Sequence, residues 1–475
     1  MKQNFKYFLG IVIAIALLLP MLQSKFTFFD QEKLEGVTTV TDKPEFNKKN
    51  YWDLVWQENY NKYLNDNFGF RTQFVKAYNQ VLYSLFNTTK APGVVVGKEG
   101  ELFIESYIDD YIGRNFIGKS KISQNVLKIK QLQDSLKARG KDLIVVFAPG
   151  KASFYPELIP NNYIAKKKDS TNYNYYANEF ANKQVNFIDL NKWFHQNKLK
   201  FKYNVYPKYG THWNHYGMAL GLDTIIKYIE KKRNLNMTDW DYSVVSYNTA
   251  LKGNDFDIGV LMNLTTPIEA DPNPYPVFKF KNEEDAYKPD VLVVGDSYWW
   301  CLVGDQLPKH FFKEDEYWFY NKTQLIKNEK RGDVKNLNLS ASLAQRDVVL
   351  LIATEATFYM FPYGFVDNAH KLYCQDNSKR LNELIVNINY DKAWLQSVTK
   401  KAIDHNISLN EQLKIEAEYL LSEELLNSKE SVEDIIVRIK SDDTWMKEVK
   451  KKAAEKNISI EQQIKEDAQW TFNNS

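Results

Sequence analysis

The sequence has little cysteine and little histidine. Its 475 residues include two cysteines, Cys301 and Cys374, which match neither a zinc-ligand spacing nor a CxxC redox motif. A single disulfide between them is possible if the body of the protein lies outside the cytoplasm. The sequence does not decide whether this disulfide forms. Among the six histidines, His212 and His215 are three residues apart. No third ligand of suitable type lies nearby, so zinc hydrolysis is only a remote alternative, and we expect no metal and no cofactor.

The sequence also lacks an excess of charge of either sign. It has 62 Lys and Arg residues against 60 Asp and Glu residues, a net charge of +2. This balance creates no strong field to attract nucleic acid, so we expect no nucleic-acid partner. A glycine-rich phosphate loop is missing too, because Gly97-Lys98-Glu99-Gly100 lacks the GKS/T ending and is typical of a hairpin turn.

One long uncharged run lies at the amino terminus, over residues 7–24. A membrane-spanning helix needs roughly 20 apolar residues, so this run is short but adequate. A cleaved signal peptide is the alternative, yet no small-x-small cleavage pattern follows in Leu22-Gln23-Ser24-Lys25-Phe26. We therefore expect residues 1–25 to form a cytoplasmic amino terminus and a single-pass anchor in the cell membrane. Lys2 and Lys6 would keep that terminus inside, with the body on the extracytoplasmic, periplasmic side.

The middle of the chain alternates between apolar runs and helical patterns. Four runs are typical of buried strands, at residues 143–147, 185–190, 291–294 and 348–352. Helical patterns precede and separate them, notably at 123–138 and 215–232. Continuously apolar strands alternating with helices predict a mostly parallel sheet that is covered on both faces.

The remaining segments define the expected domains. Residues 26–95 read as a tether and a helical lead-in, and residues 96–372 as the α/β domain. Residues 236–289 do not follow the alternation of strands and helices, and they are predicted to be an insertion or a long loop.

Residues 380–475 contain a duplication, with copies at about 383–421 and 434–472. Trp394 matches Trp445 at a distance of 51 residues, and Asn406-Ile407-Ser408 matches Asn457-Ile458-Ser459 at the same distance. Each copy is predicted to be two helices separated by this turn, with Ser408 or Ser459 capping the second helix. The duplication predicts a small helical module without indicating its role.

The residues Gly295-Asp296-Ser297 follow the apolar run at 291–294. This arrangement predicts a hydroxyl at the carboxyl edge of a sheet, where open α/β folds bind their ligands. A serine hydroxyl needs a base to become a nucleophile, and histidine is suited to that task. His212 is the best candidate, although a histidine there could instead cap a helix or fill the core. The pair predicts covalent ester chemistry, with Ser297 and His212 as the catalytic residues.

Several motifs resemble those of alginate O-acetyltransferase-like (AlgJ/AlgX-type), SGNH-hydrolase-like proteins of bacterial exopolysaccharide systems. They occur in the family's order, after Asn67-Phe68-Gly69-Phe70-Arg71: Gly97-Lys98-Glu99-Gly100-Glu101-Leu102-Phe103, Pro149-Gly150-Lys151, Gly210-Thr211-His212-Trp213-Asn214 and Gly295-Asp296-Ser297-Tyr298. The resemblance covers roughly residues 60–370 and implies an SGNH-hydrolase-like α/β/α sandwich of permuted order, with the nucleophile strand late.

The same resemblance implies a mechanism. A membrane-bound O-acyltransferase partner would supply acetyl groups, Ser297 would take one as a covalent ester, and a hydroxyl of a polysaccharide acceptor would receive it. His212 would deprotonate Ser297 and later the acceptor. The backbone N–H of Ser297 and one further donor would hold the oxyanion.

One position departs from the family pattern. The family has an aspartate two residues before the histidine, which orients the imidazole, and here that position is Gly210. Three explanations stay open. Another acid takes its place, with Asp255, Asp257 and Glu355 as candidates; a backbone carbonyl orients the ring; or the site has decayed into a binding pocket. Asp296, next to Ser297, is expected to point to the opposite side of the strand.

Aromatic residues beside the two catalytic candidates suit a sugar, because aromatic faces stack on pyranose rings. Tyr298, Trp213 and Lys151 are therefore candidate substrate-binding residues, although such aromatics are as often core and a single lysine is more often solvated. The sequence predicts a membrane-anchored O-acetyltransferase acting on a cell-envelope or secreted polysaccharide. A polysaccharide acetylesterase with the same site, or a catalytically impaired polysaccharide-binding scaffold, are the alternatives.

Overall fold

A seven-stranded sheet lies at the centre of the molecule, in the order β10-β9-β8-β7-β11-β3-β4. We describe it from a computed structural model that covers residues 2–30, 32–36, 41–46, 52, 54–375, 377–427, 435–436, 439, 443–456 and 458–474. Five strands are parallel: β3 (Asp142–Phe147), β4 (Phe187–Asp189), β7 (Val291–Gly295), β8 (Asp315–Phe319) and β11 (Val348–Ala353). An antiparallel meander, β9 (Thr323–Ile326) and β10 (Glu329–Asp333), extends one edge.

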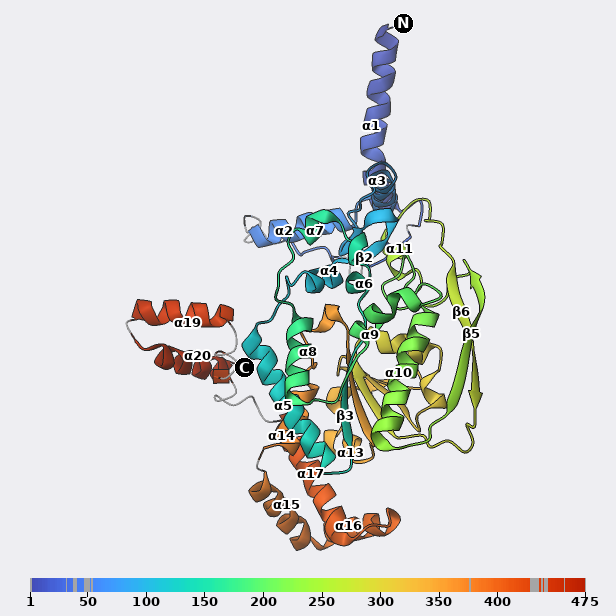
Figure 1. Ribbon diagram of the computed structural model, residues 1–475. Helices are drawn as coiled ribbons and strands as arrows, with labels where there is room; N and C mark the ends of the chain where they lie inside the picture. Colours follow the sequence, from blue (N-terminus) through green and yellow to red (C-terminus); the bar gives the residue numbers. More distant parts are fainter. Residues whose placement is uncertain are drawn as a thin grey trace.

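Helices cover both faces of this sheet (Figure 1). One layer contains α9 (Leu190–Asn197), α10 (His215–Arg233) and α12 (Ser297–Gly304). The other contains α5 (Lys119–Lys137), α8 (Asn172–Lys183), α13 (Leu339–Ala344) and α14 (Phe365–Tyr373). In β11, Leu350 and Ile352 pack in the first core, and Val349 and Leu351 pack in the second. Both faces of the strand are buried, which explains its unbroken apolar run. The expected α/β/α sandwich is confirmed.

Shorter elements surround the sandwich. The predicted turn at 97–100 joins the hairpin strands β1 (Val94–Val96) and β2 (Leu102–Ile104). Between this hairpin and β4 lie α4 (Glu105–Tyr111), α6 (Lys151–Phe154) and α7 (Asn161–Ile164). The segment 236–289 contains an antiparallel pair, β5 (Asp239–Asn248) and β6 (Asn273–Lys281), with α11 (Asp257–Leu261) between them. The insertion is therefore partly ordered structure and not only a loop.

The amino-terminal region begins with α1 (Lys2–Phe26), followed by α2 (Leu54–Asp66) and α3 (Arg71–Phe86). Within the described part of the chain, α1 is the one helix long and apolar enough to cross a membrane, over Phe5–Phe26. It stands apart from the body in Figure 1, with its apolar side chains exposed. Parts of the predicted tether, at residues 31, 37–40 and 47–50, lie outside the described residues.

The first copy of the carboxyl-terminal duplication has three helices instead of the predicted two: α15 (Ser378–Tyr390), α16 (Lys392–Asp404) and α17 (Leu409–Asn427). In the second copy, the described helices α19 (Asp443–Lys456) and α20 (Ile460–Asn474) correspond to α16 and α17. The side chains of Ser408 and Ser459 accept the predicted capping hydrogen bonds, at 3.2 Å and 3.1 Å. Asn457 and residues 428–434 lie outside the described residues.

The two copies use matching positions for their cores. Leu384, Ile388, Val398 and Leu413 of the first copy belong to the core beneath α5, α13 and α14. The residues 51 positions later, Ile435, Ile439, Val449 and Ile464, form a separate small core. The first copy is thus part of the sandwich, whereas the second has a core of its own.

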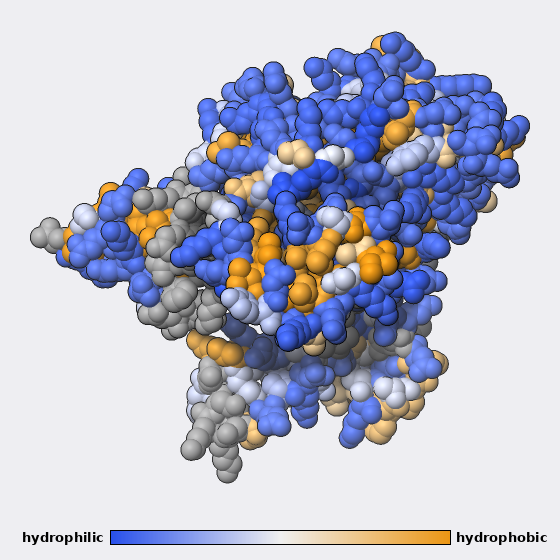
Figure 2. All heavy atoms as spheres, turned by 90° about the horizontal axis from the view of Figure 1, so that it is seen from below, coloured by the Kyte–Doolittle hydropathy of each residue, from blue (hydrophilic) through white to orange (hydrophobic). Residues whose placement is uncertain are grey.

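The face of the molecule seen from below is mostly hydrophilic, with one apolar patch near its centre (Figure 2). In Figure 1 this is the face from which α15 and α16 project. Their exposed apolar side chains include Val386, Tyr390 and Ile403. The first copy therefore exposes a few apolar side chains in addition to those that pack on the sandwich.

Candidate active site

Ser297 lies where the central strand β7 turns into helix α12. Asp296 is the residue before the helix, and its carboxylate accepts a hydrogen bond from Tyr298 N at 3.1 Å. The same carboxylate accepts from the backbone and the hydroxyl of Thr354 after β11, both at 2.7 Å. These bonds fasten the end of β7 to the end of β11. Ser297 is thereby held at the carboxyl edge of the sheet, in the first turn of a helix.

His212 reaches Ser297 from a separate segment. Its Nε2 lies 2.8 Å from Ser297 Oγ. The segment is held in place because Asn214 caps α10, its side chain accepting from Tyr216 N at 3.1 Å and Gly217 N at 2.9 Å. Two residues 85 positions apart in the chain are thus at the distance that proton transfer requires.

Asp257, at the start of α11, contacts the other side of the imidazole. Its Oδ2 lies 2.8 Å from His212 Nδ1, and its Oδ1 accepts from Thr211 N at 2.7 Å. The carboxylate therefore favours the tautomer with the proton on Nδ1, which leaves Nε2 free to accept the Ser297 proton. The geometry is that of a Ser-His-Asp catalytic triad. We call these three residues the relay below.

The packing around Gly210 explains why the acid comes from position 257. A Cβ at Gly210 would lie 2.6 Å from Asn254 O and 3.0 Å from Asp255 O. The loop that brings in Asp257 therefore occupies the space that an aspartate side chain at position 210 would need.

The other two candidate acids bond elsewhere. Asp255 Oδ2 accepts from Tyr275 Oη at 2.5 Å and from Lys252 N at 3.1 Å. Glu355 is buried after β11, where its Oε1 accepts from Asn191 Nδ2 at 3.1 Å. Burial raises the pKa of Glu355 to about 7. The structure brings together Ser297, His212 and Asp257, and places Asp255 and Glu355 in structural contacts.

A groove runs beside this relay, along the next turn of α12. Its volume is about 360 Å³, and its lining includes Trp300, Cys301, His215, Lys252 and Asp305. Trp300 is 38% exposed, and its indole Nε1 donates to Asn328 Oδ1 at 3.1 Å. Because Trp300 and Cys301 follow Ser297 by three and four residues in a helix, all three share one face of α12. An exposed indole is thus available within one helical turn of the hydroxyl.

Comparison with known proteins identifies the domain that carries this site. Residues 94–299, which include both His212 and Ser297, match the family model described as the SGNH hydrolase-like domain of the acetyltransferase AlgX. Over these residues the chain is similar to an SGNH hydrolase-like domain of the AlgJ/AlgX type. Below we call residues 94–299 the AlgX-type domain.

Relatives outside the family model agree with this assignment. A probable alginate O-acetylase AlgJ of Pseudomonas putida is 23% identical over 170 residues, 35% of this chain and 42% of that protein. A probable alginate O-acetylase AlgJ of Pseudomonas fluorescens is 27% identical over 154 residues, 32% of this chain and 37% of that protein. The chain therefore spans less than half the length of these curated relatives.

Solved structures show distant similarity. The O-acetyltransferase domain of Pseudomonas putida AlgJ has a TM-score of 0.39 and 18% identity, over 59% of this chain and 99% of that one. Pseudomonas aeruginosa AlgX has a TM-score of 0.34 and 16% identity, over 56% of each chain.

Within the AlgX-type domain, Lys151 is a buried structural residue and not a substrate contact. It is 2% exposed, and its ammonium pairs with Glu101 at 2.7 Å. The same Nζ donates to the carbonyls of Leu102, Pro207, Lys208 and Gly210 at 2.8–2.9 Å. Burial lowers the pKa of Lys151. The residue ties the first hairpin to the segment that precedes His212, which corrects both expectations for it, substrate binding and solvation.

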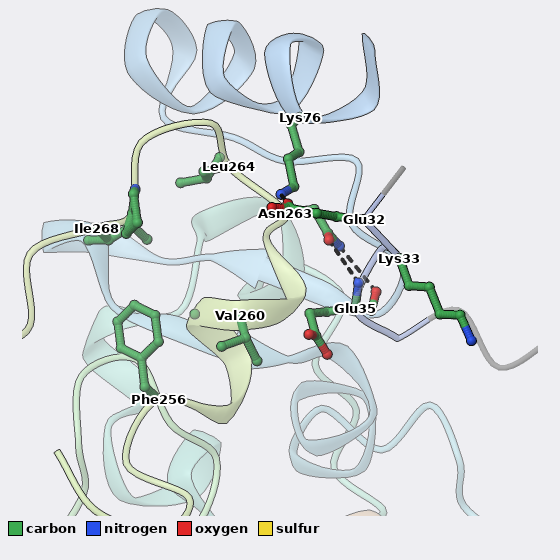
Figure 3. A pocket seen from close by; sticks show the side chains of 11 residues that line it. Glu32, Lys33, Glu35, Lys76, Phe256, Val260, Asn263, Leu264 and Ile268 are labelled. Carbon is green, nitrogen blue, oxygen red and sulfur yellow. Dashed lines mark hydrogen bonds and ion pairs between the residues drawn. The ribbon is translucent and has the colours of Figure 1, made fainter. Parts of the chain in front are cut away.

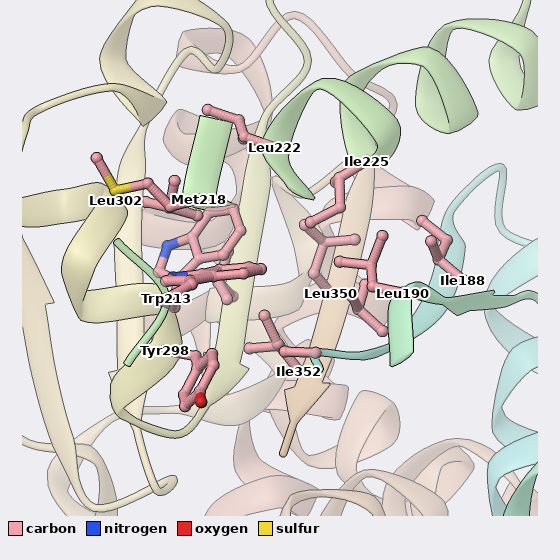
Figure 4. Close-up of a cluster of buried hydrophobic side chains, with 14 of the residues drawn as sticks. Ile188, Leu190, Trp213, Met218, Leu222, Ile225, Tyr298, Leu302, Leu350 and Ile352 are labelled. Carbon is pink, nitrogen blue, oxygen red and sulfur yellow. The ribbon is translucent and has the colours of Figure 1, made fainter. Parts of the chain in front are cut away.

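Tyr298 and Trp213 also belong to the core of the AlgX-type domain. They are 0% and 3% exposed, and Figure 4 shows them among apolar side chains of α10 and β11. The Tyr298 hydroxyl donates to Thr211 O at 3.0 Å, and its ring lies 5.2 Å from that of His212. For Tyr298 the expectation of substrate contact is wrong in this structure, because α12 turns it inward, whereas Trp213, in the segment before α10, is largely buried but also lines the groove described above. They support the histidine segment from behind.

Tyr320 is a site residue that the sequence analysis missed. It follows β8, the strand beside β7, and its backbone N–H donates to Gly295 O at 2.8 Å. Its hydroxyl lies close to the Ser297 side chain, and burial raises the pKa of this phenol, so that the hydroxyl keeps its proton. Recognising residues 315–319 as a fifth parallel strand would have placed Tyr320 at the same edge as Ser297.

Neither cysteine is paired in the structure: Cys301 and Cys374 are both free thiols. Burial raises the pKa of Cys301, so its thiol stays protonated and is a poor nucleophile. Among the described residues, no group of three His, Cys, Asp or Glu side chains is arranged to hold a metal ion. In the AlgX-type domain the reactive candidate is therefore the Ser297 hydroxyl.

Proposed function

We propose that this protein is an O-acetyltransferase that carries an acetyl group on Ser297 and transfers it to a hydroxyl of a cell-envelope or secreted polysaccharide. The observation that carries the proposal is the relay of two 2.8 Å contacts, from Asp257 through His212 to Ser297. The family model of an AlgX acetyltransferase over residues 94–299 supports the choice of acyl group.

The first half of the reaction loads the enzyme. His212 Nε2 takes the proton of Ser297 Oγ as that oxygen attacks the carbonyl carbon of the acetyl donor. The Oγ–C bond forms, and the carbonyl oxygen becomes an oxyanion. The N–H of Ser297 at the first turn of α12 and the Tyr320 hydroxyl are the donors that we assign to this oxyanion. The donor's C–O or C–S bond then breaks, and its leaving group takes the proton from Nε2.

The second half transfers the acetyl group. An acceptor hydroxyl gives its proton to His212 Nε2 and attacks the acetyl carbon of the Ser297 ester. The new ester bond forms, the Ser297 Oγ–C bond breaks, and Oγ recovers the proton from Nε2. Asp257 stabilises the charged imidazole during both halves, because its carboxylate accepts the Nδ1–H.

The groove beside the relay supports a polysaccharide as the substrate. Trp300 offers an exposed aromatic face one turn from Ser297, and pyranose rings stack on such faces. A polysaccharide acetylesterase would bind its substrate through the same surface, so the dependence on acceptor in the test below separates the two activities. The scaffold alternative was based on the absence of an aspartate at position 210, which would orient the imidazole. Asp257 contacts the imidazole in its place, which supports a working catalytic site.

Location follows from the amino-terminal helix. We propose that α1 anchors the protein in the cell membrane with the body on the extracytoplasmic, periplasmic side, supported by its apolar stretch at Phe5–Phe26. By resemblance, a membrane-bound O-acyltransferase would deliver the acetyl group to Ser297. The names of the AlgJ relatives, which refer to alginate, suggest an acidic polysaccharide as one acceptor to test.

The test uses the full chain in detergent micelles with p-nitrophenyl acetate as donor, with and without acceptor oligosaccharides of uronic acids and of neutral sugars. We expect acetyl on Ser297 by mass spectrometry and acetylated oligosaccharide as product. Ser297→Ala should abolish both, whereas Ser342→Ala, on α13 at the opposite face of the sheet, should change neither.

Two other results would redirect the proposal. Release of acetate at a rate indifferent to every acceptor indicates an esterase. Absence of any adduct in a folded protein that still binds oligosaccharide indicates a scaffold.

A further inference from the structure

The helix α3 turns its polar side chains toward the protein. Thr72 Oγ1 donates to Glu32 O at 2.8 Å, and Lys76 pairs with the Glu32 carboxylate at 2.5 Å. Asn79, 4% exposed, donates from Nδ2 to Met262 O at 2.9 Å. Figure 3 shows Lys76 pointing from α3 down to Glu32. The polar residues of this helix are thus used for internal contacts.

The opposite side of α3 is apolar and exposed. Phe74, Tyr78, Val81 and Leu85, here called the outward face, have exposed fractions of 54%, 55%, 49% and 72%. Their spacing of four, three and four residues aligns them along one side of the helix. A helix on the surface of a soluble protein shows the reverse arrangement, with apolar side chains inside. An exposed apolar stripe of this kind marks a binding surface.

The base of α1 lies against the start of α3. Ser24 Oγ donates to Asn67 O at 3.0 Å, and a Cβ at Gly69 would lie 2.0 Å from Pro20 O. Gln23 is 1% exposed and donates to Phe29 O at 2.6 Å. The last turns of α1 and the first residues of α3 are therefore held at the same level of the molecule.

The axis of α3 is oriented as expected for a helix that lies along the surface of a membrane crossed by α1. In Figure 1, α1 stands upright and α3 is seen nearly end-on directly beneath it, so α3 runs across the axis of α1. If α1 crosses the membrane, α3 is parallel to the membrane plane at its outer boundary. Amphipathic helices in that position bury their apolar side at the level of the lipid headgroups.

We propose that the outward face of α3 lies in the outer interface of the membrane that α1 spans. Tyr78 suits this position, because its ring is apolar and its hydroxyl is polar. The inference rests on the anchoring part of the proposed function and is independent of the chemistry at Ser297. It commits to lipid as the occupant, because the covalent connection to α1 brings α3 to the bilayer without any partner.

The contacts of α3 with the segment after α11 also determine where the Ser297-His212-Asp257 relay lies relative to the membrane. Asn79 and Gln80 of α3 hydrogen-bond to Met262 O and Thr266 N, both at 2.9 Å. These residues directly follow α11, the helix that begins with Asp257. The catalytic edge of the sheet therefore lies on the membrane side of the domain, where a membrane-bound donor would present its acetyl group.

The experiment measures the depth of α3 in vesicles that contain no other protein. The full chain, with Cys301 and Cys374 replaced by Ala, is labelled with a fluorophore at Val81→Cys or, as the matched control, at Gln73→Cys. Gln73 is exposed on the same helix but lies outside the outward face. Reconstitution uses phosphatidylcholine and phosphatidylglycerol, with doxyl lipids or aqueous iodide as quenchers. Thermal unfolding followed by circular dichroism, compared with the unlabelled wild-type chain, reports that the domain is folded.

We expect the Val81 label to be quenched by shallow doxyl lipids, with an iodide quenching constant several-fold smaller than that of the Gln73 label. Equal iodide quenching of both labels, while the chain resists carbonate extraction, overturns the inference and leaves the proposed chemistry untouched. Release of the chain by carbonate overturns the anchor itself. Shielding of Val81 that arises only when a multi-pass acyltransferase is co-reconstituted identifies a protein-docking face and also overturns it.

Discussion

Replacing Asp257 by asparagine tests the relay most directly, because the structure dictates how the amide will be oriented. Thr211 N donates to Asp257 Oδ1 at 2.7 Å, so an amide at this position keeps its oxygen toward Thr211. Its NH₂ group then faces His212 Nδ1, which must lose its proton to accept that hydrogen bond. The proton moves to Nε2, which can no longer accept from Ser297. In serine proteases this exchange lowers kcat by about 10⁴-fold, equivalent to ~5.4 kcal/mol of transition-state stabilisation.

The assay is the rate of Ser297 acetylation by p-nitrophenyl acetate, followed by mass spectrometry, with thermal unfolding as the check on folding. Asp257→Asn should lose three to four orders of magnitude, roughly as far as the exchange does in serine proteases. Asp255→Asn should retain its rate within about tenfold, since Asp255 does not touch the imidazole. Adding Gly210→Asp to Asp257→Asn should not restore activity, because its Cβ would lie 2.6 Å from Asn254 O. A rate for folded Asp257→Asn within tenfold of the wild type would refute the relay.

Three further predictions concern the surroundings of the relay. Trp300→Ala should raise KM for the acceptor oligosaccharide several-fold and leave acetylation of Ser297 unchanged, as measured by acceptor titration; an unchanged KM contradicts the stacking role. Lys151→Met should cost about 3–5 kcal/mol in the free energy of unfolding, because it leaves Glu101 buried without its partner; urea denaturation with a midpoint like the wild type contradicts it. Burial raises the pKa of Glu355 from 4.5 to about 7, so the stability that its protonated form contributes is complete below pH 4.5 and is lost as pH rises through about 7. Glu355→Gln should therefore reduce the loss of stability between pH 5 and 8.5 by on the order of 3 kcal/mol. A smaller loss remains because burial also raises the pKa of Asp110, to about 8. Identical stability profiles for the variant and the wild type would exclude the raised pKa of Glu355.

The sandwich could be predicted from the sequence because its strands are buried on both faces. Four strands at 143–147, 185–190, 291–294 and 348–352 were expected, and each corresponds to a strand of the central sheet. The strand β8 was missed, because Asp315-Glu316-Tyr317-Trp318-Phe319 begins with two acidic residues instead of an apolar run. Glu316 is nevertheless buried, because its carboxylate pairs with Arg346. An ion pair between residues distant in sequence cannot be read from local periodicity.

The site was predictable only where residues are adjacent to recognisable motifs. Ser297 and His212 lie in short motifs, and the structure puts them in contact. Asp257 could be named only as one of three acids, because the contact between α11 and the His212 segment depends on how the insertion folds back. Tyr298 was predicted to contact substrate, whereas the exposed aromatic side chain of α12 is Trp300. The helical period starting at Ser297 turns position 298 inward and position 300 outward.

The carboxyl-terminal duplication has a consequence for how the protein can change over time. One copy supplies side chains to the interior of the sandwich, so its apolar positions are constrained by α5, α13 and α14. The other satisfies its own interior with Ile435, Ile439, Val449, Ile464 and Ala468. Substitutions on the surface of that second copy leave the core of the sandwich untouched. The first copy is thus fixed as part of the structural core, whereas the surface of the second copy is free to evolve contacts with other molecules.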